Sequence, residues 1–281
     1  MRRLITRLAR LGVVTLSLSA TAGLAELAAA AEFRIQTSLY MGGAKDPASK
    51  NLTLFKDDVV YDYIESPQEV TMFDPRRGRF VLFDVERRLR TEIPTKDVAR
   101  NLQELRVHLA NQKDNPVAKF FQAPQFDTDL DPETDELVLS SPLLTYRVTT
   151  LPVDDSAALM TYIRFANAYA QLNAVTKPGS MPPFPRMAMN EILKSRGVIP
   201  AKLEFTFSNP AKLAANKSVT LKSVHNVQWR LFADDNKQIA ETGKHLVTFK
   251  LVPPKEYLQL TNEAPDQNQQ AQRQPVGKKQ R

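Results

Sequence analysis

The chain has 281 residues, a formal net charge of +7 and no cysteine. Apolar residues make up 42% and charged residues 25%, which is ordinary for a globular protein. The lack of cysteine excludes a disulfide-stabilised mini-protein, a cysteine-ligated zinc site and a thiol enzyme. With only 9 glycines, the chain is also poor in the loops that bind phosphate through glycine backbone.

Residues 1–31 have the pattern of a secretory signal peptide. Four arginines stand near the start, an apolar run covers 11–24, and Ala29, Ala30 and Ala31 offer a cleavage site of small residues. The apolar run is shorter than the ~20 residues that a membrane-spanning helix needs, which favours cleavage over the alternative, a retained anchor. An exported chain without cysteine fits the bacterial periplasm, or secretion from a bacterium, better than a eukaryotic secretory route.

The C-terminal residues 262–281 are polar, rich in glutamine and basic, and we expect them to be disordered. Between the leader and this tail, residues 32–261 carry 30 basic and 28 acidic residues, a net charge of +2. The basicity of the whole chain is therefore no indication of nucleic-acid binding, and we expect no nucleic-acid partner. No linker divides 32–261, which is predicted to be a single domain.

Short strands and turns follow one another through the first third of this segment. The predicted strands are 33–39, one beginning at 52, 59–64, 69–73, 79–83 and 89–93. The turn at 74–78 combines an Asp that can hydrogen-bond forward, a Pro that presets φ and a Gly that accepts positive φ. Its repetition about ten residues later, at 84–88, is typical of an antiparallel meander.

Helices and further strands follow. Val98, Leu102, Leu105 and Leu109 fall on one face of a predicted helix, 95–111. The other predicted elements are helices at 154–175, at 187–196 and around 240, and strands at 136–140, 143–149, 201–207 and 218–231. Since strands occur in runs and do not alternate with helices, the sequence predicts an α+β fold, a large curved antiparallel sheet covered by two to four helices.

The sequence contains no strong metal or catalytic motif. The acidic run 127–136 begins like a calcium loop, but Pro132 stands where that loop needs glycine and Val138 where it needs glutamate. A solvated hairpin turn is favoured, and calcium is the alternative. The three histidines, His108, His225 and His245, have no ligand spacing. We therefore predict no metal, no cofactor and no enzymatic activity.

Arginines cluster in the turns of two adjacent hairpins. Arg76, Arg77, Arg87 and Arg88 could contact an anionic membrane surface or another anionic partner, because guanidinium groups pair with phosphates. The alternative is that they pair locally with the neighbouring acidic side chains and serve solubility.

The proline-rich segment 177–186 carries two large apolar residues, Met181 and Phe184. It is either a lid over an apolar cavity or a loop in which Phe184 fills the core. Trp229, on the last long strand, is expected in the core.

The runs 54–62, 73–75 and 79–82 resemble the β-meander of the periplasmic lipoprotein-carrier superfamily, the LolA/LolB-like proteins. Residues 32–281 as a whole also resemble secreted proteins of planctomycete-type bacteria. The carrier resemblance implies a half-open curved sheet, or half-barrel, covered by helices, with a hydrophobic cavity for acyl chains.

The leading hypothesis is a periplasmic binding or carrier protein for a hydrophobic, amphiphilic or acylated ligand, held between the curved sheet and the helices at 95–111 and 154–175. A dry aliphatic sheet face with no converging polar groups would support this hypothesis. The residues expected to contact the ligand are Met181, Phe184, Leu102, Leu105, Leu159 and Ile163. Two alternatives stay open. One is a non-enzymatic module that binds an envelope protein or cell-wall polymer. The other is a hydrolase whose site assembles from distant His, Asp or Glu residues.

Overall fold

The computed structural model describes residues 31–208 and 218–262. The predicted signal peptide and C-terminal tail lie outside these residues, apart from positions 31 and 262. The strands are β1 (Phe33–Met41), β2 (Ser49–Lys56), β3 (Val59–Ile64), β4 (Glu69–Asp74), β5 (Arg79–Asp84), β6 (Leu89–Pro94), β7 (Asp127–Leu130), β8 (Leu137–Ser140), β9 (Leu144–Pro152), β10 (Val198–Ser208), β11 (Ser218–Gln228) and β12 (Lys250–Leu251). The helices are α1 (Thr95–Asn111), α2 (Pro116–Gln122), α3 (Ser156–Thr176), α4 (Phe184–Ser195), α5 (Ala233–Thr248) and α6 (Pro254–Asn262).

All twelve strands belong to one sheet, in the order β12-β6-β5-β4-β3-β2-β1-β11-β10-β9-β8-β7. Every neighbouring pair is antiparallel except the short β12–β6 pair. The meander β1–β6 joins the second half of the sheet through β1 and β11, which pair from Arg34 with Gln228 to Met41 with Leu221. The predicted α+β class and the large antiparallel sheet are confirmed.

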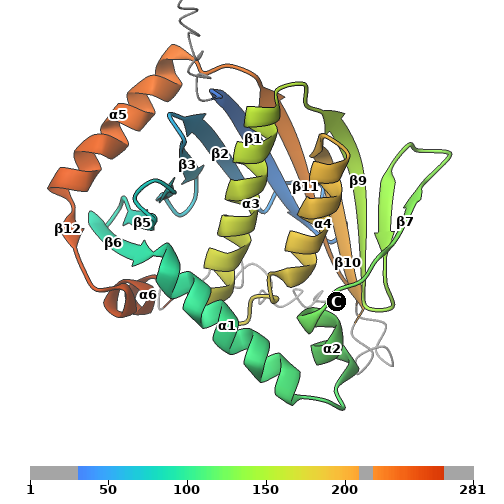
Figure 1. Cartoon of the computed structure of the whole chain (residues 1–281). Helices are drawn as coiled ribbons and strands as arrows, with labels where there is room; N and C mark the ends of the chain where they lie inside the picture. Colours follow the sequence, from blue (N-terminus) through green and yellow to red (C-terminus); the bar gives the residue numbers. More distant parts are fainter. Residues whose placement is uncertain (1–30, 209–217, 263–281) are drawn as a thin grey trace, which may run out of the picture.

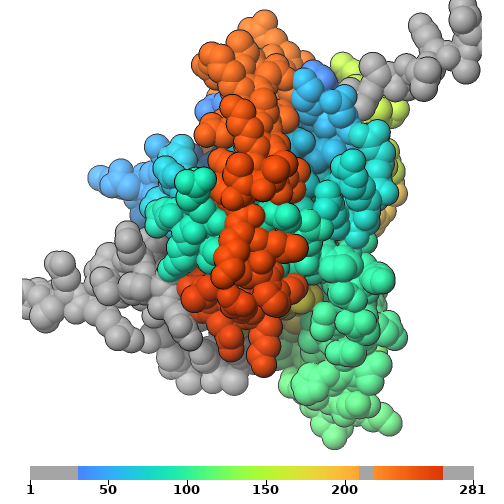
Figure 2. Space-filling view, turned by 90° about the vertical axis from the view of Figure 1, so that its left-hand side faces the viewer, coloured from blue at the N-terminus to red at the C-terminus, as the bar shows by residue number. Residues whose placement is uncertain are grey.

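Helices cover both faces of the meander. The larger core lies between one face of the sheet and the helices α1, α2, α3, α4 and α6, and Figure 1 shows α3 and α4 side by side against that face. The opposite face of β3, β4 and β5 packs against α5 in a second, smaller core. In Figure 2 the orange-to-red segment formed by α5, β12 and α6 runs down this side of the molecule.

Strand periodicity explains the two cores, because successive side chains of a strand point to opposite faces. Phe33 and Phe55 point toward α3, where their rings stack with centroids 4.0 Å apart. Val81 and Phe83 of β5 point the other way, toward α5. A strand buried on both faces has no polar side, and β5 accordingly reads Phe80-Val81-Leu82-Phe83 without alternation.

Six helices are present among the described residues, more than the two to four that the sequence predicts. One helix beyond those predicted is α2. Asn115 begins it, since its side chain accepts hydrogen bonds from the backbone of Val117 and Ala118. Likewise α4 begins at Phe184 and not at 187. Proline suits the first turn of a helix, where its missing N–H costs nothing, so Pro185 does not exclude helix there.

The expected core position of Trp229 is wrong. Strand β11 ends at Gln228 and the indole is 46% exposed. Its ring lies 5.4 Å from that of Phe33, so Trp229 covers the end of the core and does not fill it.

Candidate functional site

One cavity, named the main cavity here because the candidate site lies in it, is formed between α3 and the inner face of strands β1, β2 and β3. Its volume is about 420 Å³. Much of its wall is apolar, including Ile35, Leu39, Phe55, Ile64, Phe165 and Ala170. Ligand pockets in proteins are typically clefts of roughly 300–1,000 Å³ with mainly apolar walls and a few polar groups. In volume and wall composition this cavity is therefore a candidate ligand site.

A second cavity of about 400 Å³ continues along α3 toward α6. Its wall shares Ser49, Ile64, Tyr169, Asn173 and Lys177 with the first cavity. The two adjoin, and together they run along the sheet face from β1 and β11 to Leu82 of β5 and to α6.

Small side chains on α3 leave this space open. Ala166 and Ala170 are four residues apart and both line the main cavity, because residues at this spacing lie on the same helix face. One turn further along, Asn173 and Lys177 add polar groups to the wall.

Asp62 is the buried polar centre of the cavity, with 2% of its surface exposed. Its Oδ1 atom accepts hydrogen bonds from Asn51 Nδ2 and Thr53 Oγ1, both at 2.7 Å. Its Oδ2 atom is buried and has no hydrogen-bond partner among the residues that the structure describes. The two donors on β2 therefore fix the carboxyl group and leave one oxygen free.

Burial raises the pKa of Asp62, and hydrogen bonds from Thr53 and Asn51 act in the opposite direction. The Tyr169 hydroxyl and the charge of Lys177 also lower this pKa, although Tyr169 makes no hydrogen bond of acceptable geometry to Oδ2. The pKa of Tyr169 is raised well above its ordinary value by burial and by Asp62. Tyr169 therefore keeps its proton and faces the carboxyl group as a neutral hydroxyl.

His225 of β11 lines the same cavity in its neutral form. Burial, with a smaller contribution from the charge of Arg186, lowers its pKa to about 4. Its Nδ1 atom lies 2.9 Å from Thr37 Oγ1 and its Nε2 atom 2.9 Å from Ser223 Oγ. Both ring nitrogens contact hydroxyl groups, and no carboxylate orients the ring as in a Ser-His-Asp triad.

Two cations complete the wall. Lys177 and Arg186 both line the main cavity. Arg186 takes part in none of the ion pairs found among the described residues. This cavity therefore does not provide the dry aliphatic sheet face, without converging polar groups, that would support the leading hypothesis. Asp62, His225, Lys177 and Arg186 converge on a wall that is otherwise largely apolar.

The six apolar residues predicted to contact a ligand line neither this cavity nor its neighbour. Leu102, Leu159, Ile163 and Phe184 are buried in the larger core, and Met181 and Leu105 pack against it partly exposed. Phe184 is 4% exposed, and the guanidinium of Arg106 lies 4.1 Å from its ring centroid. The structure brings these residues together as packed core, and their contact with a ligand stays a prediction.

The four arginines predicted to contact an anionic surface do not form one patch. Arg76 and Arg77 lie in the β4–β5 turn and Arg87 and Arg88 in the β5–β6 turn, at opposite ends of β5. Each also has a local contact. Arg77 pairs with Asp74 and Arg87 with Asp84, at 3.0 and 2.6 Å, as the alternative interpretation expects.

Arg76 Nη2 donates a hydrogen bond to the backbone oxygen of Asp57 at 2.6 Å. The guanidinium of Arg88 lies 5.9 Å from the ring centroid of Phe249. Binding of an anionic surface by these arginines stays a prediction.

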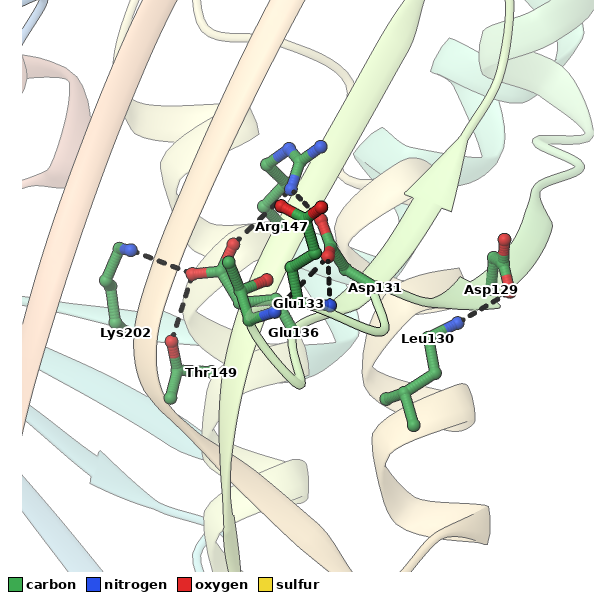
Figure 3. A network of polar contacts seen from close by, with 9 residues as sticks. Asp129, Leu130, Asp131, Glu133, Glu136, Arg147, Thr149 and Lys202 are labelled. Atoms are coloured by element: carbon green, nitrogen blue, oxygen red, sulfur yellow. Dashed lines mark hydrogen bonds and ion pairs between the residues drawn. The ribbon is translucent and has the colours of Figure 1, made fainter.

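The acidic run 127–136 lies in the β7–β8 hairpin, and the carboxylates of Asp129, Asp131 and Glu136 bind protein groups (Figure 3). Asp131 accepts hydrogen bonds from the backbone of Glu133 and Thr134 and pairs with Arg147. Glu136 pairs with Lys202 at 2.8 Å. Across 31–208 and 218–262, no group of three or more His, Asp or Glu residues is arranged to hold a metal ion.

Sequence reasoning missed the polar residues of the cavity. One feature of the sequence could have identified them. Asp62 stands at the centre of the predicted strand 59–64, on the same face as Val60 and Ile64. A charged residue on an inward strand position is uncommon unless it is paired or functional. On β2, Asn51 and Thr53 precede Phe55 on the same face and belong to the same pattern.

None of the helices in the described part of the chain combines the length and apolar character needed to cross a membrane. No protein-family model matches the chain, and no curated protein matches its sequence. Among solved structures, the chain is similar to a LolA superfamily protein from Nitrosomonas europaea, with 10% sequence identity and a TM-score of 0.28. That match covers 73% of this chain and 89% of the other. The α+β assignment rests on this chain's own strand order and helices.

Proposed function

We propose that this protein is a binding or carrier protein for an amphiphilic ligand, one that joins an apolar chain to a polar head. The observation that carries this proposal is the cavity between α3 and strands β1–β3, with apolar side chains around a buried carboxyl group. A purely hydrocarbon ligand would cover the polar groups of this wall without hydrogen-bonding to them, which is costly in a buried site. A fully polar ligand would bury no apolar surface of its own against the apolar part of the wall.

The energetics of burial support useful affinity. Each methylene group transferred from water to an apolar wall contributes about 0.8 kcal/mol. The adjoining cavity toward α6 extends the available path along the sheet, and its wall includes Leu82, Leu172 and Leu258. An acyl chain running along α3 would bury several methylene groups there, and the head would remain near Asp62.

The wider setting is part of the proposal. Residues 1–31 would direct export to the periplasm or the medium, residues 32–261 would act as one carrier domain without enzymatic activity, and the basic tail would lie beyond it. The arginine-bearing turns at either end of β5 would offer contact with an anionic membrane surface or an envelope protein.

The test is native mass spectrometry of the protein purified without detergent, followed by organic extraction and by titration with a fluorescent fatty-acid probe. We expect a stoichiometric lipid or acylated molecule, or saturable uptake of the probe. A clean ligand-free mass together with no probe uptake would overturn the proposal and favour the interaction-module alternative.

A matched pair of variants locates the site. Ala170→Phe fills the cavity from α3, and we expect it to weaken probe binding by at least about tenfold, since displacing two methylene groups costs about 1.6 kcal/mol. Ala157→Phe makes the same change at an exposed position of the same helix and should leave probe binding unchanged. Equal effects of the two variants would place any binding elsewhere.

A further inference from the structure

Arg186 is a cation in the wall of the main cavity that has no carboxylate partner among the described residues. It stands in the first turn of α4, which packs beside α3 in front of the sheet (Figure 1). Its side chain is half-buried and forms none of the ion pairs and none of the side-chain hydrogen bonds of acceptable geometry found in 31–208 and 218–262. A partly buried charge gains from an opposite charge, so this position suits an anion.

The guanidinium group of Arg186 is accessible from the cavity. Arg186 lines the cavity, and none of its nitrogens is among the buried polar atoms that lack a partner in the described part of the chain. Nitrogens that have no protein acceptor and are not buried face open space. The Tyr162 hydroxyl is close enough to interact with Arg186. A guanidinium has five N–H donors, however, and a phenol neither takes most of them nor neutralises the charge.

The titratable side chains that respond to the charge of Arg186 are neutral at pH 7. Burial raises the pKa of Tyr146 to about 12 and also raises the pKa of Tyr162, and the charge of Arg186 acts in the opposite direction on both. Burial and the charge of Arg186 together lower the pKa of His225 to about 4. Both ring nitrogens of His225 already contact the hydroxyl groups of Thr37 and Ser223. This end of the cavity therefore has a positive charge that its neighbours do not offset.

Lys177, the other cation of the wall, has carboxyl groups near it. Burial raises the pKa of Asp62 and of Glu69, and the charge of Lys177 acts in the opposite direction on both. Asp62 belongs to β3 and Glu69 to β4, whereas Arg186 acts on His225 of β11, three strand positions from β3. Lys177 and Arg186 therefore serve different strands of the wall, and an anion is favoured at Arg186.

We propose that the main cavity selects amphiphiles whose head group carries a carboxylate or a phosphate, and that Arg186 binds this anion. A guanidinium group matches both anions, because its N–H groups can pair with two oxygens at once. A cationic head group would meet the like charge of Arg186. This inference rests on the proposed function and deepens it, because it names the substrate class of the same cavity.

Four ligands with the same twelve-carbon chain test the proposal on the full chain at neutral pH. They are laurate, dodecyl phosphate, the uncharged dodecanol and the cationic dodecyltrimethylammonium, and each displaces N-phenylnaphthylamine, an uncharged fluorescent probe. We expect laurate, dodecyl phosphate or both to bind at least about tenfold more tightly than dodecanol, the effect of one charge-assisted hydrogen bond. Dodecyltrimethylammonium should bind most weakly. The tighter anion identifies the head group as a carboxylate or a phosphate.

Arg186→Gln is the matching protein variant. It removes the charge, so the preference for the anions should fall about tenfold while the affinity for dodecanol stays the same. Arg186→Lys keeps a charge at this position and should keep part of the preference. Arg196→Gln removes a charge from an exposed position at the other end of α4, and it should bind like the wild type. Circular dichroism and thermal unfolding establish that the variants are folded.

The outcomes separate this inference from the proposed function. If the wild-type protein binds dodecanol as tightly as both anions, the selection for an anion is overturned and the carrier function stands. A preference that persists in Arg186→Gln, or that falls equally in Arg196→Gln, also overturns the role of Arg186. Failure of all four ligands and of the probe to bind the wild-type protein overturns the proposed function, and this inference with it.

Discussion

Arg34 on β1 and Asp235 on α5 form an ion pair with an Nη1–Oδ1 distance of 2.8 Å. Both side chains are largely buried, with 13% and 2% of their surface exposed. Asp235 Oδ2 also accepts a hydrogen bond from the backbone N–H of Phe232 at 2.7 Å, where α5 begins. A single carboxylate therefore stabilises the start of α5 and ties the helix to the centre of the sheet, 201 residues away in the sequence.

Asp235→Ala should lower the free energy of unfolding by about 3 kcal/mol, because it leaves the Arg34 charge buried without a partner and removes the contact at the helix start. Asp234→Ala is the control, since its side chain is 88% exposed and pairs only with Lys237. The control should have little effect on stability, because an ion pair between exposed side chains contributes little. Urea unfolding of both variants measures the difference, and equal losses would contradict the role of Asp235.

Asp84 and Arg87 should contribute unequally to stability although they form one pair. Asp84 is buried and accepts hydrogen bonds from both the backbone N–H and the guanidinium of Arg87, at 2.8 and 2.6 Å. Asp84→Ala breaks the turn contact and should cost about 1–2 kcal/mol. Arg87→Ala removes a side chain that is 43% exposed and should cost less than about 1 kcal/mol. A larger loss for Arg87→Ala in denaturant unfolding would show that the ion pair, and not the turn, stabilises this hairpin.

Glu136 should stabilise the protein at neutral pH and lose this effect in acid. The hydrogen bond from Lys202 is the main cause that lowers its pKa in the folded protein. A group with a lowered folded pKa contributes stability above its unfolded pKa, near 4.3, and loses it as the pH falls through the folded value. Glu136→Gln should therefore cost about 1 kcal/mol at pH 7 and less at pH 3.

The control for Glu136 is Glu133→Gln, in the exposed turn of the same hairpin. It should have little effect at either pH in the same unfolding measurements. If Glu136→Gln costs as much at pH 3 as at pH 7, the contribution of Glu136 is not electrostatic.

His225 should make the protein less stable as the pH falls from about 6.5 toward about 4. Its folded pKa is lowered to about 4, mainly by burial, whereas an unfolded histidine titrates near 6.5. The unfolded chain therefore gains a proton first, which costs about 3 kcal/mol of stability over this range. His225→Gln should flatten this part of the pH dependence, measured by chemical unfolding from pH 8 to pH 4. His108→Gln, at an exposed site on α1, should leave the slope unchanged.

The meander was readable from the sequence because its determinants are local. Each strand from β2 to β5 ends in a short turn, and the Asp-x-x-Arg pattern at 74–77 and 84–87 places a hydrogen-bonding carboxylate at the start of two of these turns. The same regularity explains why the arginines do not gather. Successive turns of a meander alternate between the two ends of its strands, so residues about ten positions apart in sequence lie at opposite ends.

The cavity could not be predicted from the sequence in the same way. In β3, the set Val60, Asp62 and Ile64 and the set Val59 and Tyr61 are both substantially apolar, because α3 covers one face and α5 the other. The alternation therefore does not show which set faces a cavity. The wall also combines β1–β3 with α3, the start of α4 and β11, and no local pattern indicates that these segments meet.

The pairing of β1 with β11 has a consequence for how the chain folds. These strands are neighbours at the centre of the sheet, yet they join residues 34–41 to residues 221–228. Contacts so distant in sequence make folding slow, because a long loop must close before the contact stabilises anything. When the chain is synthesised from its N-terminus, the middle of the sheet therefore cannot form until β11, near the end of the chain, has been made. Until then β1 and β10 each present an unpaired edge, and the cavity lacks the wall that carries His225.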